Sequence, residues 1–184
     1  MSRAIIFIDG NNLYFKLKEL SAGLNRRIHL LDFNFRGLSG YLAGINELVD
    51  IRYYIGAIKR QNNEKSEEMY ANQQKLIAKL QQQKIVIILG QLIQHPDKTF
   101  HEKGVDVRLA VEMIRLARED KYDIAYLLSS DTDLVPAVEE VQSLGKKVQY
   151  VGIAKGQSFG LTKVSDDVRL LRPEDINSFL PNIK

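Results

Sequence analysis

Short apolar runs alternate along the chain with longer segments in which apolar residues recur every three or four positions. The apolar runs are continuous rather than alternating with polar residues, which is typical of parallel strands covered on both faces. They predict strands at residues 4–8, 50–58, 85–89, 124–128 and 148–153. Helical spacing predicts helices at residues 11–21, 33–44, 64–83, 105–119 and 133–144. This alternation predicts a three-layer α/β fold in which helices flank a mainly parallel central sheet.

The glutamine-rich segment 64–83 is expected to be an amphipathic surface helix rather than a low-complexity tract. The residues that recur at spacings of three and four are Met69, Tyr70, Gln73, Leu76, Ile77 and Leu80. Breaks between elements are expected at Gly90, at His95-Pro96-Asp97 and at Gly145-Lys146-Lys147. The sequence shows no internal repeat and no long linker, so residues 1–184 are expected to form one domain.

Four aspartates border these apolar elements. Asp9 ends the first apolar run, Asp106 begins the fourth helix, and Asp131 and Asp133 follow the fourth strand. A carboxylate is rarely buried unless it is paired, hydrogen-bonded or bound to a cation. Ligands of open α/β sheets bind beyond the carboxyl ends of the strands. If the fold brings these segments together, four negative charges share one pocket, and a hard divalent ion with oxygen ligands is the natural counter-charge.

Helical spacing predicts which way Asp106 faces. The polar stripe of its helix consists of Arg108, Glu112, Arg115 and Glu119. At 100° per residue, Asp106 lies roughly 160° from the middle of that stripe. Asp106 is therefore expected to point inward at the helix N-terminus, where the helix dipole favours an anion.

Each aspartate also has an ordinary structural explanation, and these alternatives remain open. Asp133 can cap a helix that starts at Leu134, and Asp106 can cap amides at the start of its own helix. Asp9 can be a turn residue, and Asp131 can form an Asx-turn. The interpretation in which all four have only such roles is less favoured, because each borders a buried strand or helix face.

Composition and charge narrow the class of protein further. The net charge of +3 and the pI of about 9.0 favour a polyanionic partner. The absence of cysteine removes disulfides, thiolate nucleophiles and cysteine-based zinc sites, and fits a reducing compartment. No apolar stretch reaches the roughly 20 residues of a membrane-spanning helix, and no secretion signal opens the chain. A cytoplasmic protein without a membrane partner is expected.

Several common chemistries lack their sequence motifs. There is no G-x-G-x-x-G or G-x-x-x-x-G-K-[ST] segment for a nucleotide and no G-x-S-x-G segment for a serine hydrolase. Asn11 stands where an aspartyl phosphatase would have its second aspartate. The histidines His29, His95 and His101 show no metal-ligand spacing and are expected in loops or on the surface.

Three short motifs occur in order along the chain: Phe7-Ile8-Asp9-Gly10-Asn11-Asn12, Lys103-Gly104-Val105-Asp106 and Ser129-Ser130-Asp131-Thr132-Asp133-Leu134. They resemble the signatures of NYN domains, which belong to the PIN-like nuclease superfamily. Ser158-Phe159-Gly160-Leu161 with Ser165-Asp166 resembles the closing motif of the LabA/DUF88-like branch, although Ser165 and Val168 depart from its usual pattern. The resemblance runs from residue 5 to about 168, nearly the whole chain. It implies a PIN-like Rossmannoid fold and a divalent-metal-dependent ribonuclease.

The resemblance also implies roles for individual residues. The catalytic acids, which would also bind Mg²⁺ or Mn²⁺, would be Asp9, Asp106, Asp131 and Asp133. Asn12 would orient Asp9 or a metal-bound water, and Ser130 would hydrogen-bond a carboxylate or the scissile phosphate. Lys103 and Ser158 from the same motifs would help to position the substrate, as would Lys155, which follows the 148–153 strand and is expected at the sheet edge that carries the acids. Cleavage would leave a 5′-phosphate and a 3′-hydroxyl.

RNA is the expected partner, and single-stranded DNA stays open because readout of the 2′-hydroxyl leaves no sequence signature. Basic candidates for phosphate contacts are Arg26-Arg27, Lys59-Arg60 and Lys146-Lys147. Tyr14 and Phe15 offer rings for base stacking, although packing in the core is the favoured explanation. The alternative function is a non-catalytic RNA-binding or regulatory module that retains a metal site. Retention of all four acids favours the enzyme, because a pure binder gains nothing from negative charge facing phosphate. A homodimer is compatible with the sequence, but no residue pattern argues for it.

Overall fold

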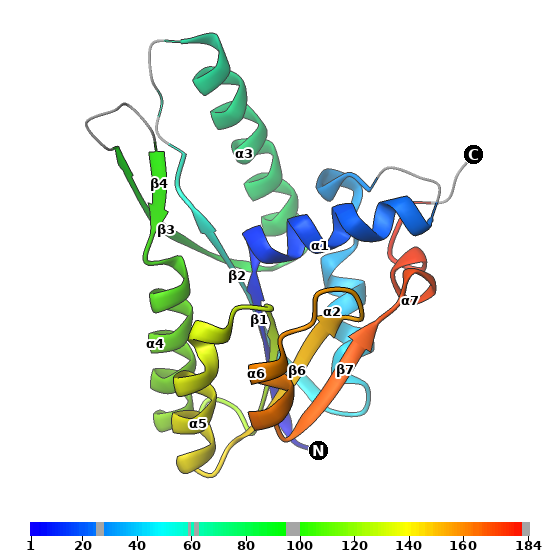
Figure 1. The fold of residues 1–184 in the computed structure, drawn as a ribbon, viewed down its shortest axis with the longest axis vertical. Coiled ribbons are helices and arrows are strands. Elements are labelled where there is room, and N and C mark those ends of the chain that lie inside the picture. The colour runs from blue at the N-terminus through cyan, green and yellow to red at the C-terminus, as the bar shows by residue number, and fades with distance from the viewer. Residues whose placement is uncertain (25–27, 59, 61–62, 95–99, 182–184) are drawn as a thin grey trace.

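Seven strands form the central sheet in the computed structural model of the protein (Figure 1). The structure describes residues 1–24, 28–58, 60, 63–94 and 100–181, without the side chains of residues 22–23 and 91–103. The strands are β1 (Arg3–Asp9), β2 (Glu47–Gly56), β3 (Val86–Gln94), β4 (Phe100–Lys103), β5 (Ile124–Leu128), β6 (Lys147–Ile153) and β7 (Asp167–Leu171).

Helices cover both faces of the sheet, as the two apolar cores show. Both cores contain strand residues; the α-helical residues of one core come from α1, α2, α3 and α7, and those of the other from α4, α5 and α6. The helical elements are α1 (Gly10–Gly23), the 3₁₀ turn η1 (Leu30–Asp32), α2 (Phe35–Ala43), α3 (Glu64–Gln82), α4 (Val105–Arg118), the 3₁₀ turn η2 (Thr132–Leu134), α5 (Val135–Ser143), α6 (Phe159–Val164) and α7 (Pro173–Asn177). No helix in the described ranges has both the length and the apolar character needed to cross a bilayer.

The strand order is β4-β3-β2-β1-β5-β6-β7, with every pair parallel except β3 and the edge strand β4. This confirms the predicted α/β fold with its mainly parallel sheet. From β1 the chain first builds outward through β2 and β3, and then returns to β1's other side with β5. The order therefore reverses between β1 and β5, which is where open α/β sheets bind their ligands.

Strand β1 forms because each of its faces meets a different core. Ile5 and Phe7 are buried with α4 and α5, whereas the alternate residues Ile6 and Ile8 are buried with α1 and α2. Successive side chains of a strand point to opposite faces, so burial on both faces requires a continuous apolar run. The run ends at Asp9, the first residue that reaches the carboxyl edge of the sheet.

The predicted strands and helices occur close to their expected positions, with one instructive difference. Gly90 was expected to end its strand, but β3 continues through it to Gln94. A β-carbon at Gly90 would lie 2.2 Å from Val105 Cγ2, so this glycine serves close packing of α4 on the sheet rather than a break. The elements that were not predicted are η1, β4, α6, β7 and α7.

Two residues also differ from expectation. Glu112 was assigned to the exposed stripe of its helix, yet it faces β2, where it contacts Arg52 Nε at 3.3 Å and accepts a hydrogen bond from Tyr54 Oη at 2.9 Å. The Arg52 and Glu112 side chains are only 14% and 12% exposed, so their opposite charges offset one another at this position, with Asp50 as a further partner of Arg52 at 3.1 Å. His101 was expected on the surface or in a loop, and it lies not in a loop but in the edge strand β4, paired with Ile93. His95 lies outside the described residues.

Candidate functional site

Three of the four predicted aspartates line one cavity of about 350 Å³ at the carboxyl edge of the sheet. Asp9 comes from the end of β1, Asp106 from the first turn of α4, and Asp131 from the segment that follows β5. The other residues that line the cavity are Asn11, Asn12, Phe15 and Val105. The cavity thus lies at the reversal of strand order between β1 and β5, and segments far apart in sequence build it.

Asp9 is the most constrained of these acids. It caps helix α1, because its Oδ1 accepts the backbone N–H of Asn12 at 3.0 Å. Its Oδ2 accepts the hydroxyl of Ser129 at 3.0 Å. Burial raises the pKa of Asp9 above its ordinary value, the two hydrogen bonds lower it, and the charge of Asp131 raises it again, with a net upward shift. The protein therefore holds this carboxylate where negative charge is unfavourable unless a cation offsets it.

Ser129 joins two of the acids. Ser130 was expected to hydrogen-bond a carboxylate or the scissile phosphate, and that role stays a prediction. The Ser129 hydroxyl donates to Asp9 and its oxygen accepts the backbone N–H of Asp131 at 3.2 Å. The register between β1 and β5 pairs Ile8 with Leu128, so the next residue on each strand is Asp9 and Ser129. Aligning the two apolar runs by their ends would have identified this serine.

Asp131 has a structural role in addition to its place on the cavity. Its Oδ1 accepts the backbone N–H of Asp133 at 2.9 Å, which caps η2 and is the Asx-turn considered as an alternative. Asp133 itself is exposed and is not among the described residues that line the cavity. The N-cap of α5 is Leu134 without a side-chain hydrogen bond, so Asp133 does not cap α5, and Asp131 caps the preceding turn η2.

Asp106 is the second residue of α4, and its place on the cavity agrees with the inward direction that its helical spacing predicts. The N-cap of α4 is Gly104, whose φ of 79° is left-handed and lets the chain turn from β4 directly into the helix. The neighbouring Val105 is buried against β3 and fixes the start of the helix. Asp106 is partly exposed, which leaves its carboxylate open to the cavity.

The donor set of this cavity suits a hard divalent ion that keeps part of its water shell. Within the described part of the chain, no three acidic or histidine side chains lie close enough to coordinate one ion directly. Mg²⁺ is usually held by one or two carboxylates, several waters and the phosphates of the substrate. Three carboxylates around 350 Å³ fit such an ion, and its charge would offset the burial and the repulsion from Asp131 that raise the pKa of Asp9.

A small neighbouring cavity of about 20 Å³ lies between α1, β5 and β6. Asn12, Ser130 and Lys16 line it. Lys16, which the sequence analysis did not single out, donates from Nζ to the backbone oxygen of Gly156 at 3.0 Å. It is thus a cation tied to the loop after β6, on the side of Asn12 away from the acidic cavity.

The three other residues that were expected to position the substrate lie in different surroundings. Lys155 is exposed in the loop that follows β6, at the carboxyl edge where it was expected. Ser158 is buried and caps α6, its Oγ accepting the N–H of Leu161 at 3.3 Å while its own N–H donates to Tyr150 Oη at 3.0 Å. Lys103 ends β4, and its side chain lies outside the described residues.

Most of the basic residues proposed for phosphate contacts either lie away from the acidic cavity or fall outside the described residues. Lys147 is the first residue of β6, at the amino edge of the sheet. Lys146 pairs there with Asp120 and Asp123. Arg60 lies over the ring of Tyr70, and Arg26, Arg27 and Lys59 are outside the described residues. A phosphate track through the lysines near residue 147 would thus be remote from the acids.

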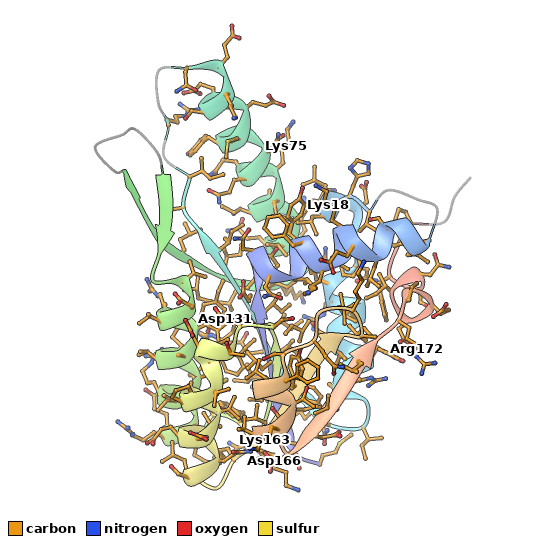
Figure 2. The ribbon with its side chains drawn as sticks, viewed as in Figure 1. Lys18, Lys75, Asp131, Lys163, Asp166 and Arg172 are labelled. Atoms are coloured by element: carbon orange, nitrogen blue, oxygen red, sulfur yellow. The ribbon has the colours of Figure 1, made fainter. Side chains whose placement is uncertain are left out.

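Asp166, in the segment that resembles the closing motif, lies at the opposite edge of the sheet from Asp131 (Figure 2). Its Oδ2 accepts the backbone N–H of Val148 at 2.8 Å and the amide of Gln142 at 2.9 Å. Burial raises the pKa of Asp166, but these hydrogen bonds outweigh it and hold the pKa below its ordinary value. Asp166 therefore joins α5 to the start of β6.

Replacing Asp166 with alanine is expected to destabilise the fold by about 1 kcal/mol, because the Val148 N–H and the Gln142 amide lose their acceptor. A carboxylate whose pKa is lowered by folding stabilises the fold above its ordinary pKa of about 4, and that contribution is lost as the pH falls through the lowered value. Urea unfolding of the wild type and of Asp166→Ala at pH 7 and pH 3 measures this contribution to the free energy of unfolding. The difference in unfolding free energy should shrink at pH 3, and an undiminished difference would contradict the ionic role.

Comparison with known proteins decides the family. A sequence model of the NYN domain matches residues 3–171 and includes all three motifs. The chain belongs to the NYN domain family. This confirms the resemblance to the PIN-like nuclease superfamily, whereas assignment to the LabA/DUF88-like branch stays a prediction. Membership of the NYN family indicates nuclease-type hydrolase activity on RNA.

One solved structure supports the fold of this NYN domain. A protein of unknown function from Vibrio parahaemolyticus is 21% identical, with a TM-score of 0.64 over 98% of this chain and 96% of that one. A substrate complex of isopentenyl phosphate kinase is 12% identical, with a TM-score of only 0.41 over 82% of this chain and 90% of that one. No curated protein matches the chain significantly.

Proposed function

We propose that this NYN domain is a divalent-metal-dependent endoribonuclease. The observation that carries the proposal is the convergence of Asp9, Asp106 and Asp131 on one cavity at the point where the strand order reverses. Asp9 and Asp131 also cap α1 and η2, but capping does not require three carboxylates around one cavity, where they repel one another. A site that binds Mg²⁺ or Mn²⁺ beside a phosphodiester would explain why these carboxylates lie together.

The carboxylates of Asp9, Asp106 and Asp131 would hold the ion, with Asp133 at the exposed margin. The ion would activate water and neutralise the charge that develops on the cleaved phosphodiester. Two hydrogen bonds, from Asn12 and Ser129, fix the direction of Asp9 and keep its remaining lone pairs free for the cavity. The Ser129 hydroxyl couples that carboxylate to the backbone of Asp131, so the two acids keep a constant relation.

The side chains of Asn11 and Asn12 supply the neutral donors of the site. Both line the cavity at the first turn of α1, beside the acids. An amide can donate to a non-bridging phosphate oxygen without adding charge, which suits a position next to carboxylates. We assign them to holding the scissile phosphate, with Lys155 as a contact for a phosphate farther along the strand.

The test is cleavage of end-labelled single-stranded and structured RNA by the purified protein with Mg²⁺, Mn²⁺ or EDTA. Cleavage is expected only with a metal, and products should carry a 5′-phosphate. In Asp106→Asn, the rate should fall about 10- to 100-fold, because one carboxylate of three is lost from a partly exposed position.

The matched control is Asp167→Asn, which also removes one carboxylate. Asp167 is exposed at the first residue of β7, at the amino edge of the sheet, and its contact with Gln149 survives through the asparagine oxygen. Its activity should equal that of wild type. Metal-dependent RNA binding without cleavage by wild type would instead support the non-catalytic module. Equal cleavage of single-stranded DNA would widen the substrate class.

A further inference from the structure

A second cavity, of about 880 Å³, lies beside the acidic one. Helices α1 and α3, the turn η1 and the end of β2 enclose it. Its walls are largely aliphatic, from residues that include Leu17, Ile28, Leu31, Ile55, Met69 and Leu76. Its volume falls within the range of about 300–1,000 Å³ typical of small-molecule sites.

The two cavities share a wall formed by consecutive residues of α1. Tyr14 lines the apolar cavity, and Phe15 lines the acidic one. Their rings pack edge to face with centroids 5.3 Å apart, and they remain 42% and 54% exposed. The expectation that these two rings pack in the apolar core beside their helix was wrong. A nucleic-acid strand bound across the three aspartates can therefore reach the apolar cavity within one or two nucleotides.

The charges around the apolar cavity are opposite to those of the acidic site. No carboxylate occurs among the described residues that line it, whereas Lys18 and His29 do. Lys18 lies on α1, near α3 (Figure 2). Asn72 adds an exposed amide from α3. An aromatic ring, aliphatic walls and a cation are the groups that bind a flat base attached to a phosphate.

We infer that the apolar cavity binds an unstacked nucleobase of the RNA substrate, one or two nucleotides from the scissile phosphate. The inference rests on the proposed function for the identity of the chain that crosses the acids. A base inside a duplex is paired and stacked and cannot enter such a cavity, so the substrate at this position is single-stranded. The cavity thus selects unpaired RNA, while the acidic site cleaves it.

The test measures binding rather than cleavage. Single-stranded RNAs of about ten nucleotides, each with one abasic residue at a different position, are titrated in EDTA against wild type and Asn72→Trp. Asn72 is exposed at the margin of the cavity, so tryptophan can fill the space without disturbing the core. With wild type, loss of the base at one or two positions should weaken binding roughly 5- to 150-fold. With Asn72→Trp, the intact and abasic strands should bind equally.

The matched control is Gln74→Trp. Gln74 is exposed on the same helix, roughly 200° around from Asn72, and does not line the cavity among the described residues. It should keep the abasic effect. The inference is overturned by equal affinity for intact and abasic strands, by an abasic effect that persists in Asn72→Trp, or by duplex RNA that binds as tightly as the single strand. Dimerisation of wild type that Asn72→Trp abolishes, without an abasic effect, would assign the cavity to a second copy of the chain.

Failure of the nuclease proposal is read from a different experiment. A wild-type protein that shows the abasic effect but never cleaves RNA with Mg²⁺ or Mn²⁺ would be a single-strand binder. That result would contradict the nuclease proposal but support the base-binding cavity. Cleavage without any abasic effect would support the nuclease proposal and contradict the base-binding cavity.

Discussion

Replacing Asp9 with asparagine is expected to lower the rate of RNA cleavage about 10²- to 10⁴-fold while leaving the fold intact. Asparagine has the same shape, its oxygen can still accept the Asn12 N–H, and its amide can donate to the Ser129 oxygen. What it loses is the negative charge at the most buried acid of the cavity. Initial rates on single-stranded RNA with saturating Mn²⁺ measure the effect.

The same substitution is expected to lower activity but not to lower thermal stability. Because folding raises the pKa of Asp9, this residue favours the folded state at low pH, and that contribution is lost as the pH rises through the raised value. At neutral pH in EDTA the ionised carboxylate therefore opposes folding, and Asp9→Asn should melt at the wild-type temperature or higher. Added Mn²⁺ should raise the Tm of wild type but not that of the variant. A variant that melts lower in EDTA and responds to Mn²⁺ as wild type does would contradict both roles.

Gly10→Ala is expected to destabilise the protein by about 3 kcal/mol and to impair cleavage with it. A β-carbon at this position would lie 2.3 Å from Cε1 of the fully buried Tyr53 and 2.8 Å from the backbone oxygen of Tyr54. The buried ring and the strand cannot both retreat, so the first turn of α1 must move. That turn carries the N–H that holds Asp9. Urea unfolding monitored by circular dichroism gives the free energy.

Gly40→Ala provides the control, because it makes the same chemical change in a helix with open space around it. No atom lies within 4 Å of a β-carbon at Gly40 of α2. Alanine should stabilise the protein by about 0.5–1 kcal/mol through its higher helix propensity. If both variants lost similar stability, the cost would come from the loss of glycine as such and not from the contact with Tyr53.

The sequence predicted the strands and the direction of Asp106 well because both depend on local periodicity. The continuous run before Asp9 can be satisfied only by a strand buried on both faces, and burial of Ile5 to Ile8 bears this out. The spacing of α4 likewise places Asp106 on the inward face, whatever its neighbours are. Gly90 was misjudged because a glycine that allows close packing and one that breaks a strand look alike in a sequence.

Properties that depend on pairs of distant residues were harder to predict from the sequence. Glu112 follows the polar periodicity of its helix, and only the position of Arg52 on β2 explains why it faces inward. Ser129 and Ser130 are adjacent and chemically equal, so the choice between them depends on the register of β1 and β5. The apolar cavity beside Tyr14 arises from the packing of α1 against α3, which no local pattern encodes.

The hydrogen bond between Asp9 and Ser129 sets a delay in biosynthesis, because it joins residues 120 positions apart. At about 5–20 residues per second, a ribosome needs roughly 6 to 24 s to add that interval. Asp106 is added before this interval ends, but Asp9 lacks both Ser129 and the carboxylate of Asp131 until β5 is complete. On the proposed function, a nascent chain of this protein would therefore be inert toward its own messenger RNA until β5 has left the exit tunnel and paired with β1.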